Sequence, residues 1–206
     1  MPVSQSPSRM RLRTFLVWTH RWLGLLSAVV LVIAGITGAL IVFPFPDAIR
    51  EPIIEFHVNL YAGQIGRWTV VAASVATLLL QAGGLWLWWP ARSLRLRTDR
   101  GLWRFSYDAH NVTGVLALPM MALLAATGVG RVVFDAVTVP EALHLVSRAV
   151  GLLHHGDGFP VPVLVFYVLG SLAFVVQAAT GVLMWWRTPA AAGRTSRLTP
   201  AAPSPD

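Results

Sequence analysis

Two residue types are missing from this chain. Among its 206 residues there is no cysteine and no lysine, so all 16 basic residues are arginines. The absence of cysteine excludes disulfides, thiolate metal sites, iron–sulfur clusters and cysteine nucleophiles. Metal chemistry would have to use His, Met, Asp or Glu, which makes the six histidines the main candidate ligands.

Charge is scarce as well. Only 12% of the residues are charged and 55% are hydrophobic, whereas an average soluble domain carries about a quarter charged residues. Much of the surface must therefore face something other than water. The net charge is +7, but the arginines flank apolar stretches and form no basic patch, which favours a membrane over a nucleic acid as the partner.

The sequence also lacks the signatures of several enzyme classes. No nucleotide-binding fingerprint is present, because Gly83-Gly84 and Gly128-x-Gly130 lie inside apolar stretches and not after a strand. There is no pairing of a nucleophile with a base and no phosphate-binding loop. The pattern therefore disfavours acyl transfer, phosphoryl transfer and oxidation of a nicotinamide by this chain itself.

Four apolar stretches are long enough to cross a bilayer, which takes about 20 apolar residues in a helix. They run from about Phe15 to Phe43, Trp68 to Trp89, Val112 to Val133 and Val161 to Trp186. Helices satisfy their own backbone hydrogen bonds, as hydrocarbon requires. The sequence predicts an all-α integral membrane protein, a bundle of four transmembrane helices with a kink at Pro119.

The arginines predict the orientation. They concentrate before the first stretch, between the second and third, and after the fourth, and arginine-rich connections stay on the cytoplasmic side. Both termini are therefore predicted to be cytoplasmic. We expect residues 12–187 to form the transmembrane domain, and residues 1–11 and 188–206 to be disordered cytoplasmic tails.

An internal repeat runs through the four stretches. A shift of 90 positions places His20 on His110, Gly24 on Gly114 and Thr37-Gly38 on Thr127-Gly128. A shift of 97 positions places His57 on His154, Gly84 on Gly181 and Trp88-Trp89 on Trp185-Trp186. The pattern predicts two parallel copies of one helix pair, about 12–90 and 104–187, related by an axis along the membrane normal.

The repeat arranges four histidines in two pairs. His20 and His110 lie at one depth near the cytoplasmic face, and His57 and His154 lie at one depth near the opposite face. Two imidazoles that face each other across the axis can supply both axial ligands of one haem. The sequence therefore predicts two haem sites, one at each face of the membrane.

Other residues are candidates for lining these sites. Gly24 and Gly114 follow the cytoplasmic-side histidines by one helical turn and leave room for a flat macrocycle. Arg21, Arg67 and Arg131 are candidate partners of haem propionates. The competing interpretations are that the glycines let helices approach closely and that the arginines are interfacial anchors.

The two remaining histidines lie in the second outer connection. His155 adjoins His154 and can replace it as the ligand, whereas His144 has the character of a solvated or hydrogen-bonded residue. Arg131 has Asp135 as a second candidate partner. Zinc is disfavoured as the metal, because Asp108 is the one carboxylate that accompanies the cytoplasmic-side pair.

Several short motifs share one order and spacing. They are His20-Arg21-Trp22-Leu23-Gly24-Leu25-Leu26 with Thr37-Gly38, His57-x-x-Leu60 with Gly66-Arg67-Trp68, the run from Gly84 to Pro90, Asp108-x-His110, Thr127-Gly128, Leu153-His154-x-Gly156 and Thr180-Gly181. Over about residues 12–187 the sequence thereby resembles the PepSY-associated transmembrane helix family. The resemblance implies haem b at the four paired histidines, in a bacterial inner-membrane protein similar to haem-containing ferric-siderophore reductases. Larger members carry soluble periplasmic PepSY domains, for which the outer connections of this chain, about 44–66 and 136–158, are too short.

These observations lead to one main hypothesis about function. The chain would be a di-haem b membrane cytochrome, either an oxidoreductase or an electron-transfer subunit. It would carry electrons from a quinol or a cytoplasmic flavoprotein to a periplasmic acceptor, in connection with ferric iron or siderophore reduction. Two competing hypotheses are a non-redox accessory or scaffold module of an iron or haem uptake system, and a protein that passes haem or metal across the membrane.

Overall fold

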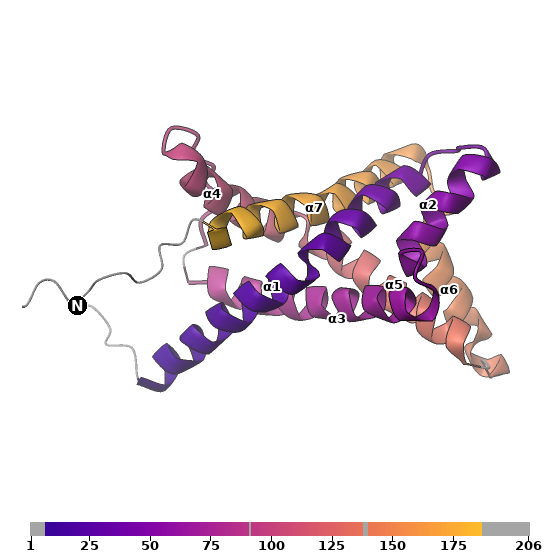
Figure 1. Ribbon diagram of the computed structural model, residues 1–206, viewed down its shortest axis with the longest axis horizontal. Coiled ribbons are helices and arrows are strands. Elements are labelled where there is room, and N and C mark those ends of the chain that lie inside the picture. Colours follow the sequence, from indigo (N-terminus) through magenta and orange to yellow (C-terminus); the bar gives the residue numbers. More distant parts are fainter. Residues whose placement is uncertain (1–6, 91, 138–139, 187–206) are drawn as a thin grey trace, which may run out of the picture.

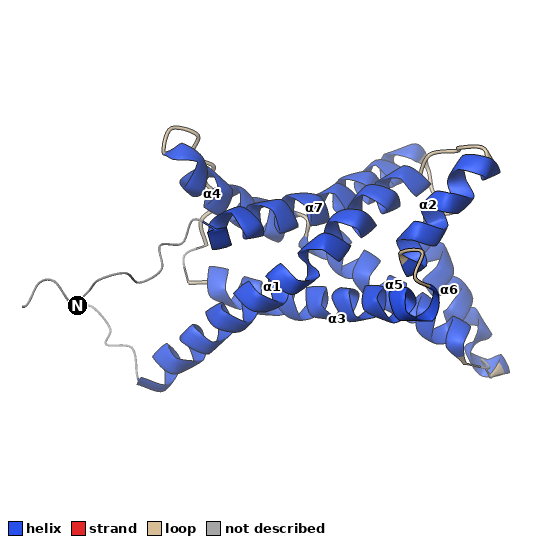
Figure 2. Cartoon of the chain, viewed as in Figure 1, coloured by secondary structure: helices blue, strands red, loops and turns tan. Residues whose placement is uncertain are grey.

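The computed structural model describes residues 7–90, 92–137 and 140–186, and within these ranges every regular element is a helix (Figure 2). The helices are α1 (Pro7–Ile41), α2 (Asp47–Asn59), α3 (Gly63–Trp88), α4 (Gly101–Leu116), α5 (Leu118–Ala136), the short 3-10 helix η1 (Glu141–Leu143), α6 (His144–His155) and α7 (Val161–Trp186). The predicted all-α fold is confirmed.

Four of these helices are long and apolar enough to span a membrane, namely α1 from Ser8, α3, α5 and α7. The chain is therefore a multi-pass membrane protein, as the four apolar stretches predicted. Helix α1 begins at Pro7, so residues 7–11 are helical where the sequence suggested a disordered tail. The predicted tail at 188–206 lies outside the described residues.

The third stretch differs from its prediction. We expected one kinked span from about Val112, but a helix already begins at Gly101 and ends at Leu116, and a second helix begins at Leu118. Pro119 explains the break, because proline favours the first turn of a helix and its ring clashes with the carbonyl of the preceding turn. The region is thus two consecutive helices joined at Ala117.

The connections between α1 and α3 and between α5 and α7 contain short helices that the search for long apolar runs did not predict. Helix α2 follows α1, and α6 follows α5, and neither has a fully buried residue. Gly156 ends α6 with φ at 73°, a left-handed conformation that glycine adopts without strain. Each of these short helices ends just after one of the predicted histidines, which therefore lies in its last turn.

The bundle is elongated. Helices α1, α3 and α7 run along its long axis, while α2 and α6 gather at one end and α4 lies at the other (Figure 1). Helix α1 packs against both α7 and α3, α3 packs against α5, and α4 packs against α7. A Cβ atom added at Gly35 would lie 2.6 Å from the carbonyl oxygen of Ser171, so α1 and α7 approach closely there.

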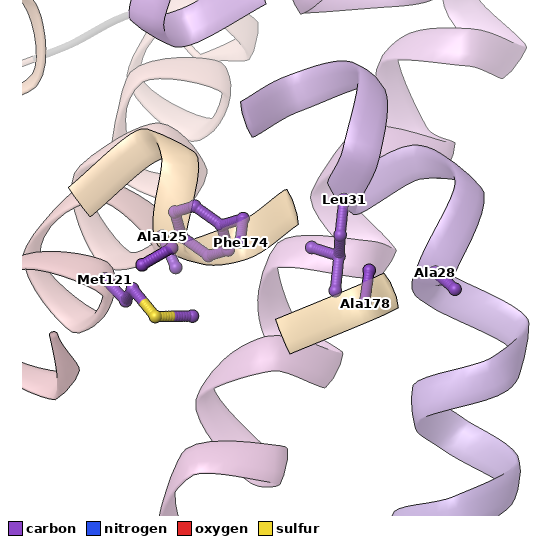
Figure 3. Close-up of a cluster of buried hydrophobic side chains, with 7 residues drawn as sticks. Ala28, Leu31, Met121, Ala125, Phe174 and Ala178 are labelled. Atoms are coloured by element: carbon purple, nitrogen blue, oxygen red, sulfur yellow. The ribbon is translucent and has the colours of Figure 1, made fainter. Parts of the chain in front are cut away.

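A cluster of buried apolar side chains occupies the middle of the bundle. It is formed by Ala28 and Leu31 from α1, Met121 and Ala125 from α5, and Ala173, Phe174 and Ala178 from α7. Figure 3 shows that most of these side chains are small or slender. Members of this cluster line two separate cavities, one bordered by α4 and one bordered by α2 and α6.

Candidate functional site

The four paired histidines come together as two couples. The ring centroids of His20 (α1) and His110 (α4) are 6.1 Å apart, and those of His57 (α2) and His154 (α6) are 6.2 Å apart. The first couple lies at the end of the bundle that carries α4, and the second at the end that carries α2 and α6 (Figure 1). These are the pairs that the internal repeat predicted.

His57 and His154 each rest on a Thr-Gly pair of a neighbouring helix. His57 Nδ1 lies 2.8 Å from the hydroxyl of Thr37, and a Cβ at Gly38 would be 3.3 Å from His57 Cε1. His154 Nδ1 lies 3.0 Å from the hydroxyl of Thr127, and a Cβ at Gly128 would be 3.1 Å from its Cε1. We call such a Thr-Gly pair beneath an imidazole a Thr-Gly seat.

His110 occupies a third Thr-Gly seat, on α7. Its Nδ1 lies 3.0 Å from the hydroxyl of Thr180, and a Cβ at Gly181 would be 3.7 Å from its Cε1. The Gln177 amide also donates to the His110 backbone carbonyl at 2.9 Å. Helix α4 is therefore attached to α7 both through the ring of this histidine and through its backbone.

The Thr-Gly seats determine which ring nitrogen carries the proton. The hydroxyls of Thr37, Thr127 and Thr180 each donate to the carbonyl four residues earlier, at 2.6 Å. A hydroxyl has a single proton, so its remaining interaction with the imidazole must be as an acceptor. Nδ1 therefore carries the hydrogen in all three rings, and the lone pair lies on Nε2, where a metal can be bound.

His20 is the exception. A Cβ at Gly84 would lie 3.2 Å from His20 Cε1, so the ring rests on a glycine like the other three. Gly83 precedes Gly84 in the sequence, and the second copy of the repeat has Thr180 at the position that corresponds to Gly83. His20 Nδ1 is buried and has no hydrogen-bond partner among the described residues, and its protonation is therefore not fixed by a neighbour.

Each couple of histidines borders a cavity. His20 and His110 line one of about 540 Å³, and His57 and His154 line one of about 730 Å³. Both volumes fall in the range of about 300–1,000 Å³ that is usual for ligand pockets. Leu31 and Thr77 border both cavities, so at that point a single layer of side chains separates them.

The other predicted site residues line the same cavities. Gly24, Gly114 and Arg21 border the His20–His110 cavity, and Arg67 and Arg131 border the His57–His154 cavity. Within the described residues, a Cβ at Gly24 would meet only the Leu80 side chain, at 3.9 Å, whereas one at Gly114 would meet the Gln177 amide, at 3.3 Å. Space beside His20 is thus open, and space beside His110 is limited by Gln177.

Residues 46–140, which include His57, His110 and helices α2 to α5, match the family described as the PepSY-associated TM region. The match supports the family resemblance over this part of the chain. The matched segment contains one histidine of each couple. No curated protein and no solved structure matches the chain.

An ion cluster joins the α3–α4 connection to the middle of α4. Asp108 is 3% exposed and accepts from the Arg97 guanidinium at 2.9 Å and from the Arg97 backbone N–H at 3.2 Å. Arg104 lies 3.3 Å from the other carboxylate oxygen. The cluster ties the α3–α4 connection to the helical turn that carries His110. Arg131 pairs with Asp135 at 3.2 Å, as the sequence suggested.

Burial favours the neutral form of His57 and His154, which lie outside the spanning helices. Burial lowers the pKa of His57, against a backbone hydrogen bond to Ala34 that raises it. Burial, followed by the neighbouring charges of His57, His155 and Arg131, lowers the pKa of His154 to about 3. A neutral imidazole is the form that binds a metal ion, so the lowered pKa values of both rings favour the state that ligation requires.

His155 and His144 lie differently from the four paired residues. The His155 ring centroid is 5.7 Å from that of His154, but its Nδ1 faces the Asp157 carboxylate at 3.5 Å and its side chain is 46% exposed. The Thr-Gly seat on α5 belongs to His154. His144 is exposed at the first residue of α6.

The threonines are the site residues that sequence reasoning missed. The sequence indicates that Thr37 and Thr127 bond to the preceding helical turn or across helices, and they do both, but histidine was not predicted as their partner. The signal was present, because Thr-Gly occurs at 37–38, 127–128 and 180–181, where each histidine rests, and is replaced by Gly-Gly at 83–84.

Proposed function

We propose that this membrane protein is a di-haem b cytochrome that carries electrons across the inner membrane to a periplasmic acceptor, in the service of ferric iron or siderophore reduction. The observation that carries the proposal is the presence of two facing imidazole couples, one at each end of the bundle, with ring centroids 6.1 and 6.2 Å apart. Bound haem would supply one-electron redox chemistry.

The spacing of each couple suits a shared metal. A first-row metal held between two imidazole nitrogens, each at about 2 Å, puts the two ring centroids roughly 6 Å apart. A haem needs only two ligands from the protein because its own ring supplies the rest. His20 and His110 would hold one haem, and His57 and His154 the other. With both imidazoles of a couple bound to one haem, the bound group would supply electron transfer.

The cavities also offer room for the flat ring of a haem and basic partners for its propionates. Gly24 adds no side chain beside His20, which leaves room for a flat ring. Arg21 borders one cavity, and Arg67 and Arg131 border the other, so each cavity has guanidinium groups for propionates. Leu31 and the buried Thr77 border both cavities, and Leu31 belongs to the cluster of buried apolar side chains in the middle of the bundle.

The electron donor would be a quinol or a cytoplasmic flavoprotein, since the chain has no nucleotide-binding fingerprint. The acceptor would be ferric iron or a periplasmic partner protein. The proposal follows the sequence resemblance and the placement of one couple at each end of a membrane-spanning bundle.

The first experiment is to purify the full chain from haem-replete cells and to record its dithionite-reduced minus oxidised spectrum. A pyridine haemochrome assay gives the stoichiometry. We expect the bands of haem b at about two haems per chain. One haem would contradict the two-site arrangement, and a colourless protein would contradict electron transfer and favour a non-redox accessory module.

Histidine variants then test the pairing. We expect His20→Ala and His110→Ala to remove one spectral component, and His57→Ala and His154→Ala to remove the other, because each couple shares one iron. His144→Ala is the matched control, since His144 is exposed and outside both couples, and it should retain both components. Loss of the same component from His57→Ala and His20→Ala would show that the couples are wrong.

A further inference from the structure

The His20–His110 couple is asymmetric. The ring of His110 is held by the Thr180 hydroxyl at 3.0 Å, whereas His20 Nδ1 is buried with no hydrogen-bond partner in the part of the chain that the structure describes. The difference comes from one position, because Gly83 stands where the repeat has Thr180. The other couple is symmetric, with Nδ1 of both His57 and His154 on threonine hydroxyls.

The rest of the seat beneath His20 is intact. A Cβ at Gly84 would lie 3.2 Å from His20 Cε1 and 3.8 Å from its Nδ1, and a Cβ at Gly128 would lie 3.1 and 3.7 Å from the same atoms of His154. The two rings thus rest on their glycines in nearly the same way. The difference between the two seats is the hydroxyl that His20 lacks.

The missing hydroxyl affects the ability of His20 to bind a metal. Ligation through Nε2 requires the proton to be on Nδ1, and at His20 that N–H would be buried without an acceptor, which costs free energy. The outer partners of metal-binding histidines typically change metal affinity by about 10- to 100-fold. His20 should therefore bind more weakly than the other three histidines.

We infer that His20 is the exchangeable ligand, and that its side of the His20–His110 cavity is a binding position for a small neutral molecule of the carbon monoxide type. The metal-binding part of this inference rests on the proposed function. Entry of such a ligand would replace the bond between Nε2 of His20 and the bound iron with a bond between the iron and the ligand. The His20 nitrogen keeps its lone pair, and no electron leaves the iron.

Position 83 gives a direct test, because a Cβ added at Gly83 meets no atom of the described residues within 4 Å. Gly83→Thr supplies the missing hydroxyl, and Gly83→Ala is the matched control without it. Thr180→Val is the reciprocal variant, because it removes the hydroxyl from His110 and keeps the shape of the side chain.

The first measurement needs no haem. Histidine-selective ¹⁵N NMR of the haem-free protein, assigned with single His→Gln variants, reports which ring nitrogen is protonated. We expect Nδ1–H at His57, His110 and His154, and a different or mixed state at His20. Gly83→Thr should convert His20 to Nδ1–H, whereas Gly83→Ala should leave it unchanged. A wild-type His20 already in the Nδ1–H form would overturn the inference, even if the protein binds two haems.

The second measurement uses the haem-loaded, dithionite-reduced protein and a carbon monoxide titration followed by absorbance. We expect carbon monoxide to bind at one haem of the wild type, with an affinity lowered about 10-fold or more in Gly83→Thr and unchanged in Gly83→Ala. Thr180→Val should bind it more tightly than the wild type does. Equal binding by Gly83→Thr and Gly83→Ala, or no binding by the wild type, would refute an exchangeable His20 and leave the di-haem proposal standing.

Discussion

A threonine hydroxyl decides the protonation of each seated imidazole, and this is the main feature at the scale of single residues. The hydroxyl donates its one proton to a backbone carbonyl of its own helix, so it can only accept a hydrogen bond from the ring. Threonine in a transmembrane helix is usually explained by that backbone bond alone. In this chain the same side chain also orients a histidine from another helix.

Under the proposed function, removing one of these hydroxyls should weaken the binding of one haem. We expect Thr127→Val to speed the loss of haem from the His57–His154 couple by about 10-fold, because His154 loses the partner that fixes its proton. The measurement follows transfer of haem to an excess of apo-globin by absorbance. Thr69→Val is the control, since the Thr69 hydroxyl also donates to a carbonyl of its own helix, that of Ile65, and Thr69 lines neither cavity. Equal rates of loss from the two variants would contradict the role of Thr127.

At this scale the sequence predicted the histidine couples but not their seats. The couples were predictable because a duplicated chain repeats its functional residues at matching depths. The seats were not, because Thr37 is 20 residues from His57 and Thr180 is 70 residues from His110. Which helix face meets which ring depends on packing between helices that no local pattern encodes.

Close contact between α1 and α7 is the main feature at the scale of helices. We expect Gly35→Ala to destabilise the protein by about 1–3 kcal/mol, because the new methyl group would lie 2.6 Å from the Ser171 carbonyl oxygen and 2.9 Å from Val175 Cγ2. Thermal unfolding in detergent, followed by tryptophan fluorescence, measures the change.

Gly83→Ala is the control for this change as well. Its methyl group would meet no described atom within 4 Å, and alanine favours the helix more than glycine does. Its unfolding midpoint should stay at or above that of the wild type. A midpoint for Gly35→Ala as high as that of Gly83→Ala would show that the two helices do not need a glycine at their contact.

The long helices were predictable, and the short ones were not. Apolar runs of about 20 residues identify spanning segments, and α7 has the predicted bounds. Helices α2 and α6 mix charged and apolar residues over 13 and 12 residues, so they lack such a run. The break at Ala117 was only partly predicted, because Pro119 indicates a kink but not two separate helices.

At the scale of the whole molecule, the absence of cysteine from the sequence gives a clean test of topology. Asp99, in the α3–α4 connection, and Glu141, at the start of η1, are both exposed. We expect Glu141→Cys to react with a membrane-impermeant maleimide added to spheroplasts, and Asp99→Cys to react only after lysis, because the arginine-rich connection should be cytoplasmic. The reverse pattern would show that the orientation is opposite to the predicted one. Labelling of both residues from outside would contradict the predicted four-span topology.

The layer of side chains around Leu31 and Thr77 has an electrical consequence. It separates two sites at opposite ends of a spanning bundle, so an electron that moves between them crosses part of the membrane voltage. A full crossing is worth about 2.3 kcal/mol per elementary charge at 100 mV. Because the cell interior is negative, the voltage itself drives electrons outward, and each transfer discharges the membrane slightly. Under the proposed function, delivery of electrons to the periplasm would therefore be electrogenic. It would slow if the sign of the membrane voltage were reversed.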